Sequence, residues 1–388
     1  MRIAIVVPRY GPQVLGGAES QARGFAEAAI QRGWEVEVWT TCARSHYTWE
    51  NVYPEGVGQE NGVRVRRFPV AWQNRERWIE LEVKLAHQGF LSPAEAYAWL
   101  ESGPHSPALY AHVARYADDF DVIIALPYAM PLVHYAAWSA PDRTILFPCL
   151  HDEPYAYLEP VRLLLESVWG VMFYSPEEGE LAARRLRISP NRQAVLGAGA
   201  SLNSISRTSA TVFSEGVSPF LLYVGRLEEG KNVPLLYEYT QRYFEERKQV
   251  RLVVIGDGPI RPPGHRAFAY LGFVPEEEKA ALCRQALALC QPSLRESFSL
   301  TLMESWLAGR PVLVHEDCAV TRGHVQRSRG GLWFGTYEEF AEALDWLVEN
   351  PDLAARMGEN GRRYVLANFT WEAILNRFEN LIRRWKEA

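Results

Sequence analysis

The stretch RIAIVVPRYGPQVLGGAESQARGFAEAAIQRGWEVEVWT, residues 2–40, holds the pattern that decides the fold. It begins with an apolar run at 2–7 that has the length of a buried parallel strand. Alanines and a phenylalanine then recur at helical spacing over 18–32, and a helix is expected to end near Gly33. The alternating residues 35–40 predict a second strand. Strand, glycine loop, helix and strand in this order predict a βαβ unit of a parallel sheet.

The same rhythm continues along the first half of the chain. Further strands are predicted at 63–68, 121–126, 144–148, 170–174 and 193–197. Helical lengths separate most of them, which favours a doubly wound α/β sheet. Two predicted helices within 75–117 interrupt the rhythm, where one crossover helix would suffice. We therefore expect a helical insertion there.

The βαβ rhythm restarts after residue 220, which predicts a second doubly wound parallel sheet. Its strands are expected at 220–225, 251–256, 268–273, 287–291 and 311–314. A chain of 388 residues exceeds what one hydrophobic core usually serves, so two domains are expected.

The polar segment 206–220 is expected to lie at the domain boundary, which gives a first domain of 1–205 and a second of 206–370. The last segment, 371–388, predicts an amphipathic helix that must dock on another surface. Its apolar stripe consists of Trp371, Ile374, Leu375, Phe378, Leu381, Ile382 and Trp385.

Composition excludes several classes of protein. The chain is 48% hydrophobic and 23% charged, the balance of a globular protein. Its net charge of -6 and pI near 5.9 give no global attraction to nucleic acid, so we expect no nucleic-acid partner. No run approaches the roughly 20 apolar residues that cross a bilayer, and the start lacks the features of a signal peptide. We expect a cytoplasmic protein whose membrane contact, if there is one, is peripheral.

The cysteines point to neither a disulfide framework nor a zinc site. The five are an odd number without a C-x-x-C pair. We expect them to be buried, reduced packing residues.

In doubly wound domains ligands bind beyond the carboxyl ends of the strands, so the loops after the strands are the candidates for chemistry. In the first such loop, Gly16 and Gly17 let the backbone approach a ligand just before a helix whose N-terminus favours an anion. A tight turn is the alternative explanation of two glycines.

The second loop, YVGRLEEGKN at 223–232, places the cations of Arg226 and Lys231 at a strand end. Both could be surface charges balanced by Glu228 and Glu229. Their position after a strand instead favours a phosphate-binding role.

The third loop, RESFSLTLMES at 295–305, places Glu296 before a helix and Glu304 inside it. Helical side chains lean toward the N-terminus, so Glu304 can reach a ligand held at the helix start, where its carboxylate suits a ribose diol. Backbone N–H groups of 297–299 would bind an anion. A solvated helix position is the alternative for Glu304, although its apolar neighbours imply that the charge needs a partner.

The fourth loop, FPCLHDEPY at 147–155, places His151 after a strand of the first domain. A hydrogen-bonded structural histidine is the common alternative at such a site. The strand-end location favours a functional role.

Six motifs in this order resemble the retaining glycosyltransferases of family 4, also called group 1. They are GGAE at 16–19, His151, VGRLEEGKN at 224–232, GDGP at 256–259, YLGFVPEEE at 270–278 and ESFSLTLMES at 296–305. The resemblance spans most of the chain and is densest over 220–315. It implies a GT-B fold: two Rossmann-like domains facing a central cleft, with the acceptor bound mainly by the first and the nucleotide-sugar donor by the second. The helix 371–388 would cross back and complete the first domain.

The resemblance also implies roles for single residues. Arg226 and Lys231 would neutralise the diphosphate, Glu304 would bind the ribose, and Glu296 would lie beside the donor sugar. His151 would lie near the C6 hydroxyl of the sugar and the reacting centre. The remaining donor-binding residues are expected to be Gly16, Gly17, Gly225, Phe273 beside the base, Ser297, Phe298, Ser299 and Leu300.

One departure from the family pattern concerns the common E-G-F-G, which here reads Glu296, Ser297, Phe298, Ser299. Two glycines are replaced by serines, whose hydroxyls could bind phosphate or cap the helix.

The implied activity is that of a retaining hexosyltransferase that uses a UDP- or GDP-sugar, in polysaccharide or glycoconjugate synthesis. Its acceptor would be a glycan, a lipid-linked molecule or a small molecule. We favour front-face substitution, in which the departing phosphate takes the acceptor's proton, since no nucleophilic carboxylate can be placed. No cofactor and no metal are expected: DFD at 119–121 mimics a D-x-D motif but precedes a strand, so Asp121 is expected only to lead that strand in.

Two other functions remain open at this point: a nucleotide-sugar epimerase or hydrolase of the same fold, and a sugar-binding protein without catalysis. The basic, aromatic run at 64–78 fits an acceptor or anionic-lipid site, or simply a strand followed by a solvated helix. The donor base and sugar, the acceptor, the linkage, the oligomeric state and the roles of Asp152 and Glu153 are not readable from the sequence.

Overall fold

The computed structural model describes residues 1–14, 16–188, 190–200 and 219–387. It divides into two compact units, one of Met1–Gly199 with Ile374–Ala388 and one of Ala200–Ala373. The expected boundary segment 206–220 lies, up to residue 218, outside the described residues. Each unit is described by itself.

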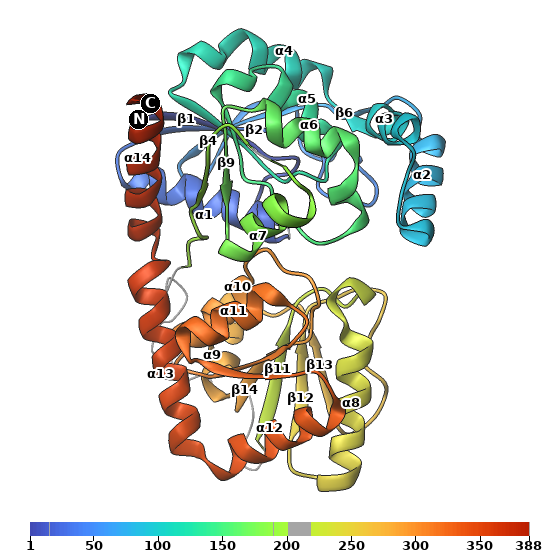
Figure 1. Ribbon diagram of the computed structural model, residues 1–388, viewed down its shortest axis with the longest axis vertical. Coiled ribbons are helices and arrows are strands. Elements are labelled where there is room, and N and C mark those ends of the chain that lie inside the picture. The colour runs from blue at the N-terminus through green and yellow to red at the C-terminus, as the bar shows by residue number, and fades with distance from the viewer. Residues whose placement is uncertain (15, 189, 201–218, 388) are drawn as a thin grey trace. The chain divides into compact units, whose positions relative to one another are not determined.

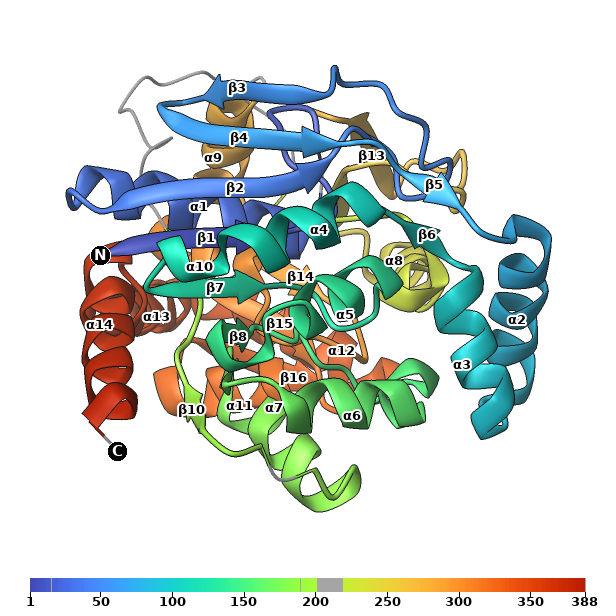
Figure 2. The same cartoon turned by 90° about the horizontal axis from the view of Figure 1, so that it is seen from above.

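The first unit is built on an eight-stranded sheet with the order β10-β9-β8-β7-β1-β2-β4-β3. All neighbours pair in parallel except β3 with β4, and Figure 2 shows β3, β4, β2, β1 and β7 in succession. The strands are β1 Arg2–Val6, β2 Glu35–Thr41, β3 Gly56–Glu60, β4 Val63–Phe68, β7 Val122–Ala125, β8 Thr144–Leu146, β9 Gly170–Phe173 and β10 Gln193–Val195.

Strand β3 was not among the predicted strands. Its sequence GVGQE contains two glycines and has no apolar alternation, because most of the strand is exposed at the sheet edge. A two-residue turn at Asn61 and Gly62, both with positive φ, joins it to β4 in a tight hairpin.

Helices of the first unit surround this sheet. They are α1 Gly17–Gln31, α2 Arg75–Gln88, α3 Pro93–Ser102, α4 Pro107–Tyr116, α5 Pro131–Trp138, α6 Glu159–Ser167, α7 Pro176–Glu180 and the last helix, α14 Trp371–Glu387. The short strands β5 Ala71–Trp72 and β6 Pro104–His105 pair with each other and enclose α2 and α3 as a separate helical pair. Ser92 begins α3 with a capping box completed by Glu95.

Helix α14 supplies part of the core of the first unit (Figure 1). Phe378 is fully buried and meets the rings of Phe25 and Phe147 edge-on. Trp385 covers Gly170 so closely that a Cβ atom there would lie 2.4 Å from its ring. Part of the apolar stripe predicted from the sequence therefore packs on the first unit, with Phe378 against Phe25 and Phe147 and Trp385 against Gly170.

The second unit is a six-stranded parallel sheet with the order β13-β12-β11-β14-β15-β16. Its strands are β11 Phe220–Val224, β12 Arg251–Ile255, β13 Phe268–Gly272, β14 Ala288–Gln291, β15 Val312–His315 and β16 Gly331–Phe334. Its helices are α8 Val233–Arg247, α9 Glu276–Gln285, α10 Leu300–Leu307, α11 Ala319–Ser328, α12 Tyr337–Glu349 and α13 Pro351–Asn368. Counted within the unit, the strand order is 3-2-1-4-5-6, that of a Rossmann domain. The order reverses between β11 and β14, where a ligand crevice is expected.

Strand β16 was also absent from the predicted set. It is only four residues long, begins with a glycine and leaves Trp333 exposed, so it lacks the apolar run of an inner strand. The two α/β sheets themselves confirm the predicted fold class. Four of the five cysteines are buried as expected, whereas Cys149 is partly exposed, and all five are free thiols.

Candidate functional site

Two glycines allow the loops that follow β11 and β12 to pack closely against each other. Gly256 has φ +126, and a Cβ atom there would lie 1.9 Å from the carbonyl oxygen of Gly225. A Cβ atom at Gly258 would lie 2.4 Å from the carbonyl oxygen of Leu227. Only glycine allows this approach, so the two loops fix the backbone that carries Arg226. Sequence reasoning used GDGP only for the resemblance and missed this packing role.

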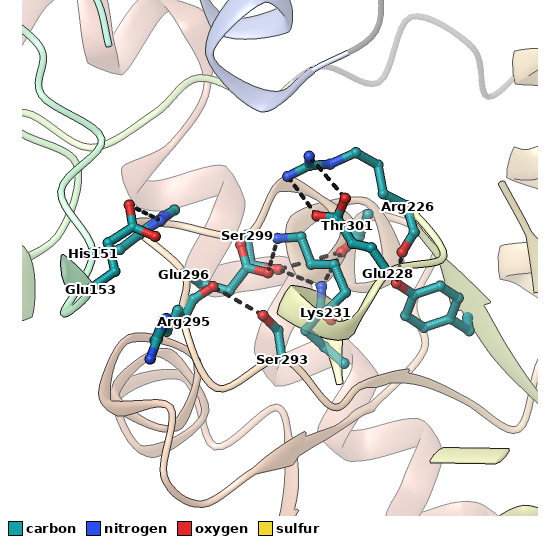
Figure 3. Close-up of polar contacts among 12 residues, drawn as sticks. His151, Glu153, Arg226, Glu228, Lys231, Ser293, Arg295, Glu296, Ser299 and Thr301 are labelled. Atoms are coloured by element: carbon teal, nitrogen blue, oxygen red, sulfur yellow. Dashed lines mark hydrogen bonds and ion pairs between the residues drawn. The ribbon is translucent and has the colours of Figure 1, made fainter. Parts of the chain in front are cut away.

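Arg226 leaves the end of β11 with its side chain 53% exposed. Its two terminal nitrogens contact the two oxygens of Glu228 at 3.0 and 3.2 Å (Figure 3). The charge balance considered from the sequence is therefore present in this state. An exposed pair of this kind contributes at most about 1 kcal/mol, so the guanidinium can exchange Glu228 for another anion at little cost.

Lys231 and Glu296 meet at the point where the strand order reverses. The Lys231 amine lies 2.7 Å from Oε1 of Glu296, with the two side chains only 19% and 10% exposed (Figure 3). Lys231 follows β11 and Glu296 follows β14, so neighbouring strands supply the two partners. Asn232, in the left-handed conformation, donates to the carbonyl of Pro292 and ties the same two loops together. The structure thus brings two predicted site residues together.

The start of α10 is not capped by the serine before it. The Ser299 side chain accepts no capping hydrogen bond from a backbone N–H of the helix; its hydroxyl lies 3.3 Å from that of Thr301 and 3.5 Å from the Gln291 amide nitrogen. The capping role considered for this serine is therefore wrong. The first N–H groups of α10 are left without this cap, as in helices that bind anions at their N-terminus.

The conformation of Ser299 also explains the departure from E-G-F-G. Its φ of +71 lies in the left-handed region, where glycine avoids a cost of about 1 kcal/mol that other residues carry. Glycine is therefore the unstrained residue at this position, and the serine adopts the same backbone at some cost.

Phe298 points into the core of the second unit. Its ring packs edge-on against those of His324 and Phe369, at centroid distances of 4.9 and 5.0 Å. The buried ring therefore leaves the backbone of Phe298 to contact a ligand. This agrees with the expectation that the backbone N–H groups of 297–299 bind an anion. Leu300, also in the predicted donor set, is the first residue of α10.

Glu304 lies one turn into α10 and has a cationic partner. The Lys279 amine, from α9, lies 3.0 Å from Oε1 of Glu304 and 2.7 Å from Glu276. Burial raises the pKa of Glu304, and Lys279 opposes that rise. The partner required by the apolar surroundings of Glu304 is thus Lys279, which sequence reasoning missed. Phe273, beyond the end of β13, is 65% exposed.

In the first unit, His151 lies in the loop after β8 beside Glu153. Nδ1 of His151 is 3.6 Å from Oε1 of Glu153, which also accepts a hydrogen bond of 2.7 Å from the buried Tyr128 hydroxyl. Asp152 turns elsewhere, to Arg185 and to the Tyr157 hydroxyl. The two acids that the sequence could not distinguish therefore differ: Glu153 adjoins His151, and Asp152 anchors the loop to residues further along the chain.

The two glycines before α1 are not equivalent. A Cβ atom at Gly16 would lie 2.1 Å from Oε2 of Glu19, whereas nothing lies within 4 Å of one at Gly17. Glu19 forms an ion pair with Arg9, and both residues are buried. Gly16 therefore makes room for a buried carboxylate, whereas no described residue restricts a side chain at Gly17. Sequence reasoning missed Arg9 and Glu19, because neither was known to be buried.

The other charged segments have structural partners. Asp121 accepts from the backbone N–H of Arg2 and from Lys386, both at 2.9 Å. In the basic run, Arg66 pairs with Glu37 at 2.9 Å. Among the described residues there is no cluster of three or more metal-ligating side chains, and no helix is both long and apolar enough to span a bilayer.

Comparison with known proteins shows what this chain is similar to. Residues 208–364 match the family model "Glycosyl transferases group 1". The chain is 23% identical to an uncharacterized glycosyltransferase of Methanocaldococcus jannaschii over 99% of this chain and 98% of that protein. It is 24% identical to alpha-D-kanosaminyltransferase of Streptomyces kanamyceticus, but this similarity spans only 42% of this chain and 45% of the relative.

Solved structures resemble the whole chain. Sucrose-phosphate synthase from Thermosynechococcus elongatus matches with a TM-score of 0.73 at 19% identity, covering 99% of this chain and 98% of that one. HepE of Anabaena in complex with UDP matches with a TM-score of 0.72 at 16% identity, covering 99% and 100%; its complex with UDP-glucose gives 0.69 at 15% identity, covering 100% of both. The chain therefore has the GT-B fold, and residues 208–364 are similar to the group 1 glycosyltransferases.

Proposed function

We propose that the protein is a retaining glycosyltransferase that moves a sugar from a nucleotide-diphosphate sugar to an acceptor. The observation that carries the proposal is the Lys231–Glu296 pair at the strand-order reversal of the matched domain. Arg226 lies in the same loop as Lys231, and α10 begins four residues after Glu296. This arrangement supplies cations, backbone N–H groups and a carboxylate from adjacent loops.

Lys231 and Arg226 are assigned to the diphosphate. When the bond from the anomeric carbon to the β-phosphate oxygen breaks, negative charge collects on that phosphate. Each cation would exchange its carboxylate partner for phosphate oxygens, with bidentate contacts from Arg226. Glu296, released from Lys231, would accept hydrogen bonds from hydroxyls of the donor sugar.

The proposed chemistry is front-face substitution. The acceptor oxygen bonds to the anomeric carbon on the face that the phosphate leaves, so the anomeric configuration is retained. The departing phosphate oxygen takes the acceptor's proton, so no protein base is required. Two protein cations at the diphosphate support a reaction that does not need a divalent metal, and activity in excess EDTA tests this.

Glu304 is assigned to the ribose hydroxyls and Phe273 to the base, and the donor is proposed to carry UDP or GDP. The UDP complexes of the structural neighbour support a nucleotide donor of this kind. His151 is assigned to the reacting sugar. The acceptor is proposed to be a glycan, a lipid-linked molecule or a small molecule in polysaccharide or glycoconjugate synthesis. The proposal places the enzyme in the cytoplasm, including the inner face of the membrane.

The test begins with thermal shifts in UDP, GDP, ADP and TDP, because at equal concentration a nucleotide that binds the folded state more tightly raises the melting temperature more. The best nucleotide then selects labelled donors for hydrolysis and transfer assays, with the anomeric configuration of the product read by NMR. We expect stabilisation by one nucleotide, transfer to an acceptor and retention.

Three outcomes would contradict the proposal. If no nucleotide raises the melting temperature, the protein has no donor site of the proposed kind. Conversion of the donor to its epimer without transfer would support an epimerase instead. An inverted product would leave a glycosyltransferase but overturn the front-face mechanism.

A further inference from the structure

A buried carboxylate holds the backbone of the loop that carries His151. Glu178, in α7, is 1% exposed. Its Oε1 accepts the backbone N–H of Leu150, and its Oε2 accepts that of Tyr174, both at 2.5 Å. Leu150 directly precedes His151. Glu178 therefore joins the loop after β8 to the loop after β9.

Local sequence explains how this side chain reaches both loops. Ser175 caps α7 by accepting the N–H of Glu178 at 3.1 Å, and Pro176 fixes the first helical residue. In an ordinary capping box the acid at this helical position turns back to the capping residue. Here it reaches one residue further back, to Tyr174, and across to Leu150. Because β8 and β9 are adjacent and parallel, both loops leave the same edge of the sheet.

The loop contains a strained residue next to this anchor. Cys149 has φ +57, a left-handed conformation that costs a residue other than glycine about 1–2 kcal/mol. Such a conformation persists only where neighbouring contacts hold it. The hydrogen bond from Leu150 to Glu178 is one such contact, immediately after Cys149 and immediately before His151.

Burying the Glu178 carboxylate costs desolvation free energy, which an apolar side chain in the same place would not cost. Burial raises the pKa of Glu178 to about 8, while its backbone hydrogen bonds lower it. The neighbouring titratable groups are Cys149 and Tyr174: the charge of Glu178 raises the pKa of both, and Glu19 also raises that of Cys149. An apolar side chain would fill the same volume without desolvating a charge, but it could not accept two N–H groups.

We propose that Glu178 is a positioning residue for His151. It fixes the backbone from which the imidazole projects, and Glu153 lies beside the ring itself. This inference rests on the proposed function, in which His151 lies at the reacting sugar. Glu178 does not contact the substrates; it acts through the Leu150 amide.

Glu178→Gln tests the proposal with little change in shape. The amide has one carbonyl oxygen, so one of the two N–H groups must face an NH₂ group. We expect hydrogen exchange of the segment that contains Leu150 to accelerate at least tenfold. In the transfer assay kcat should fall about tenfold, the scale of leaving one buried N–H group without its acceptor, with the donor KM and the nucleotide affinity unchanged. Glu180→Gln, on the exposed side of the same segment, is the matched control and should change neither quantity.

Two results would overturn the inference alone. They are an unchanged exchange rate at Leu150 in Glu178→Gln, and an unchanged kcat in an otherwise active enzyme. If the variant does not fold, Glu178→Asp should give the same pattern, because it retracts the carboxyl group by one methylene. In the wild type, the Leu150 and Tyr174 amides should exchange more slowly than those of exposed loops. Exchange as fast as that of exposed loops would also contradict the anchor. If the wild type transfers no sugar to any acceptor, the proposed function fails and the positioning role fails with it. Exchange data would then show separately whether the anchor exists.

Discussion

Both sheets consist mainly of parallel strands, but the loops at their carboxyl edges are built in different ways. In the second unit the charged groups bond to one another: Lys231 to Glu296, and Lys279 to Glu304. In the first unit Glu178 instead bonds to backbone N–H groups, of Leu150 and Tyr174. The first unit also contains ion pairs in these loops, Arg9–Glu19 and Arg185–Asp152, so the difference described here is the carboxylate of Glu178 that fixes the backbone.

The difference indicates how each unit serves a ligand. A side-chain ion pair can exchange one partner for a phosphate without moving the backbone, so the second unit can receive charge at little structural cost. A carboxylate that holds two loops cannot be exchanged without moving both. Under the proposed function, the first unit would keep a geometry and the second would accept the diphosphate.

The largest effect is expected from Lys231→Met, which breaks the ion pair of the second unit. The diphosphate loses a cation, and Glu296 is left partly buried without it. We expect kcat/KM for transfer to fall by about 10²–10³, as when a donor to developing charge is removed, and nucleotide-induced stabilisation to shrink. Lys386→Met, a lysine that pairs with Asp121 in the first unit, should leave the rate unchanged. Equal rates in wild type and Lys231→Met would refute the phosphate role.

The second effect concerns pH and Glu178 in the first unit. The folded-state pKa of about 8 lies above the ordinary 4.5, so the neutral acid is favoured on folding. The contribution of this group to stability is complete below about 4.5 and declines as pH rises to about 8. Relative to the wild type, Glu178→Gln should therefore gain free energy of unfolding across this window, by about 2–4 kcal/mol. Urea unfolding at pH 5 and pH 8.5 measures the change, and a difference between the proteins that is independent of pH would contradict it.

The third effect separates the two glycines before α1. An alanine at Gly16 would collide with the Glu19 carboxylate and disturb its pair with Arg9, so Gly16→Ala should destabilise the protein by about 1–3 kcal/mol. Gly17→Ala meets no neighbour at the first residue of α1 and should stabilise by up to about 1 kcal/mol, because alanine is the better helix former. Denaturant titration of both variants gives the comparison. Equal destabilisation would mean that Glu19 does not restrict Gly16.

The smallest effect is expected from Lys279→Met in the second unit. Without this amine the pKa of Glu304 should rise further, and less of the ionised carboxylate would be available to the ribose. We expect a three- to tenfold loss of nucleotide affinity, less at high pH than at low pH. Affinity for the 2′-deoxy nucleotide should fall less. The ratio of the affinity for the ribose nucleotide to that for the 2′-deoxy nucleotide should therefore decrease. If both nucleotides weaken equally, Lys279 has only a structural role.

Buried parallel strands were predictable because each is a short apolar run before a glycine or polar loop, as in residues 251–256 and 287–291. Strands β3 and β16 were not, because edge position removes the apolar run on which such a prediction depends.

Within the site, Arg226, Lys231, Glu296 and Glu304 could be named from the sequence, since each lies in a loop after a strand or in the helix that follows. Their partners could not. Lys231 meets a residue 65 positions away, and Leu150 meets one 28 positions away, so only the folded sheet decides which charges become neighbours.

The return of α14 to the first unit has a consequence for synthesis of the chain. The rings of Phe25 and Phe147 have been made by residue 147, but Phe378, which covers them, follows the whole second unit, Ala200–Ala373. At translation rates of 5–20 residues per second, the ribosome needs roughly 9–35 s to make those intervening 174 residues. During that interval the rings of Phe25 and Phe147 lack the contact with Phe378, which becomes possible only when the last helix emerges.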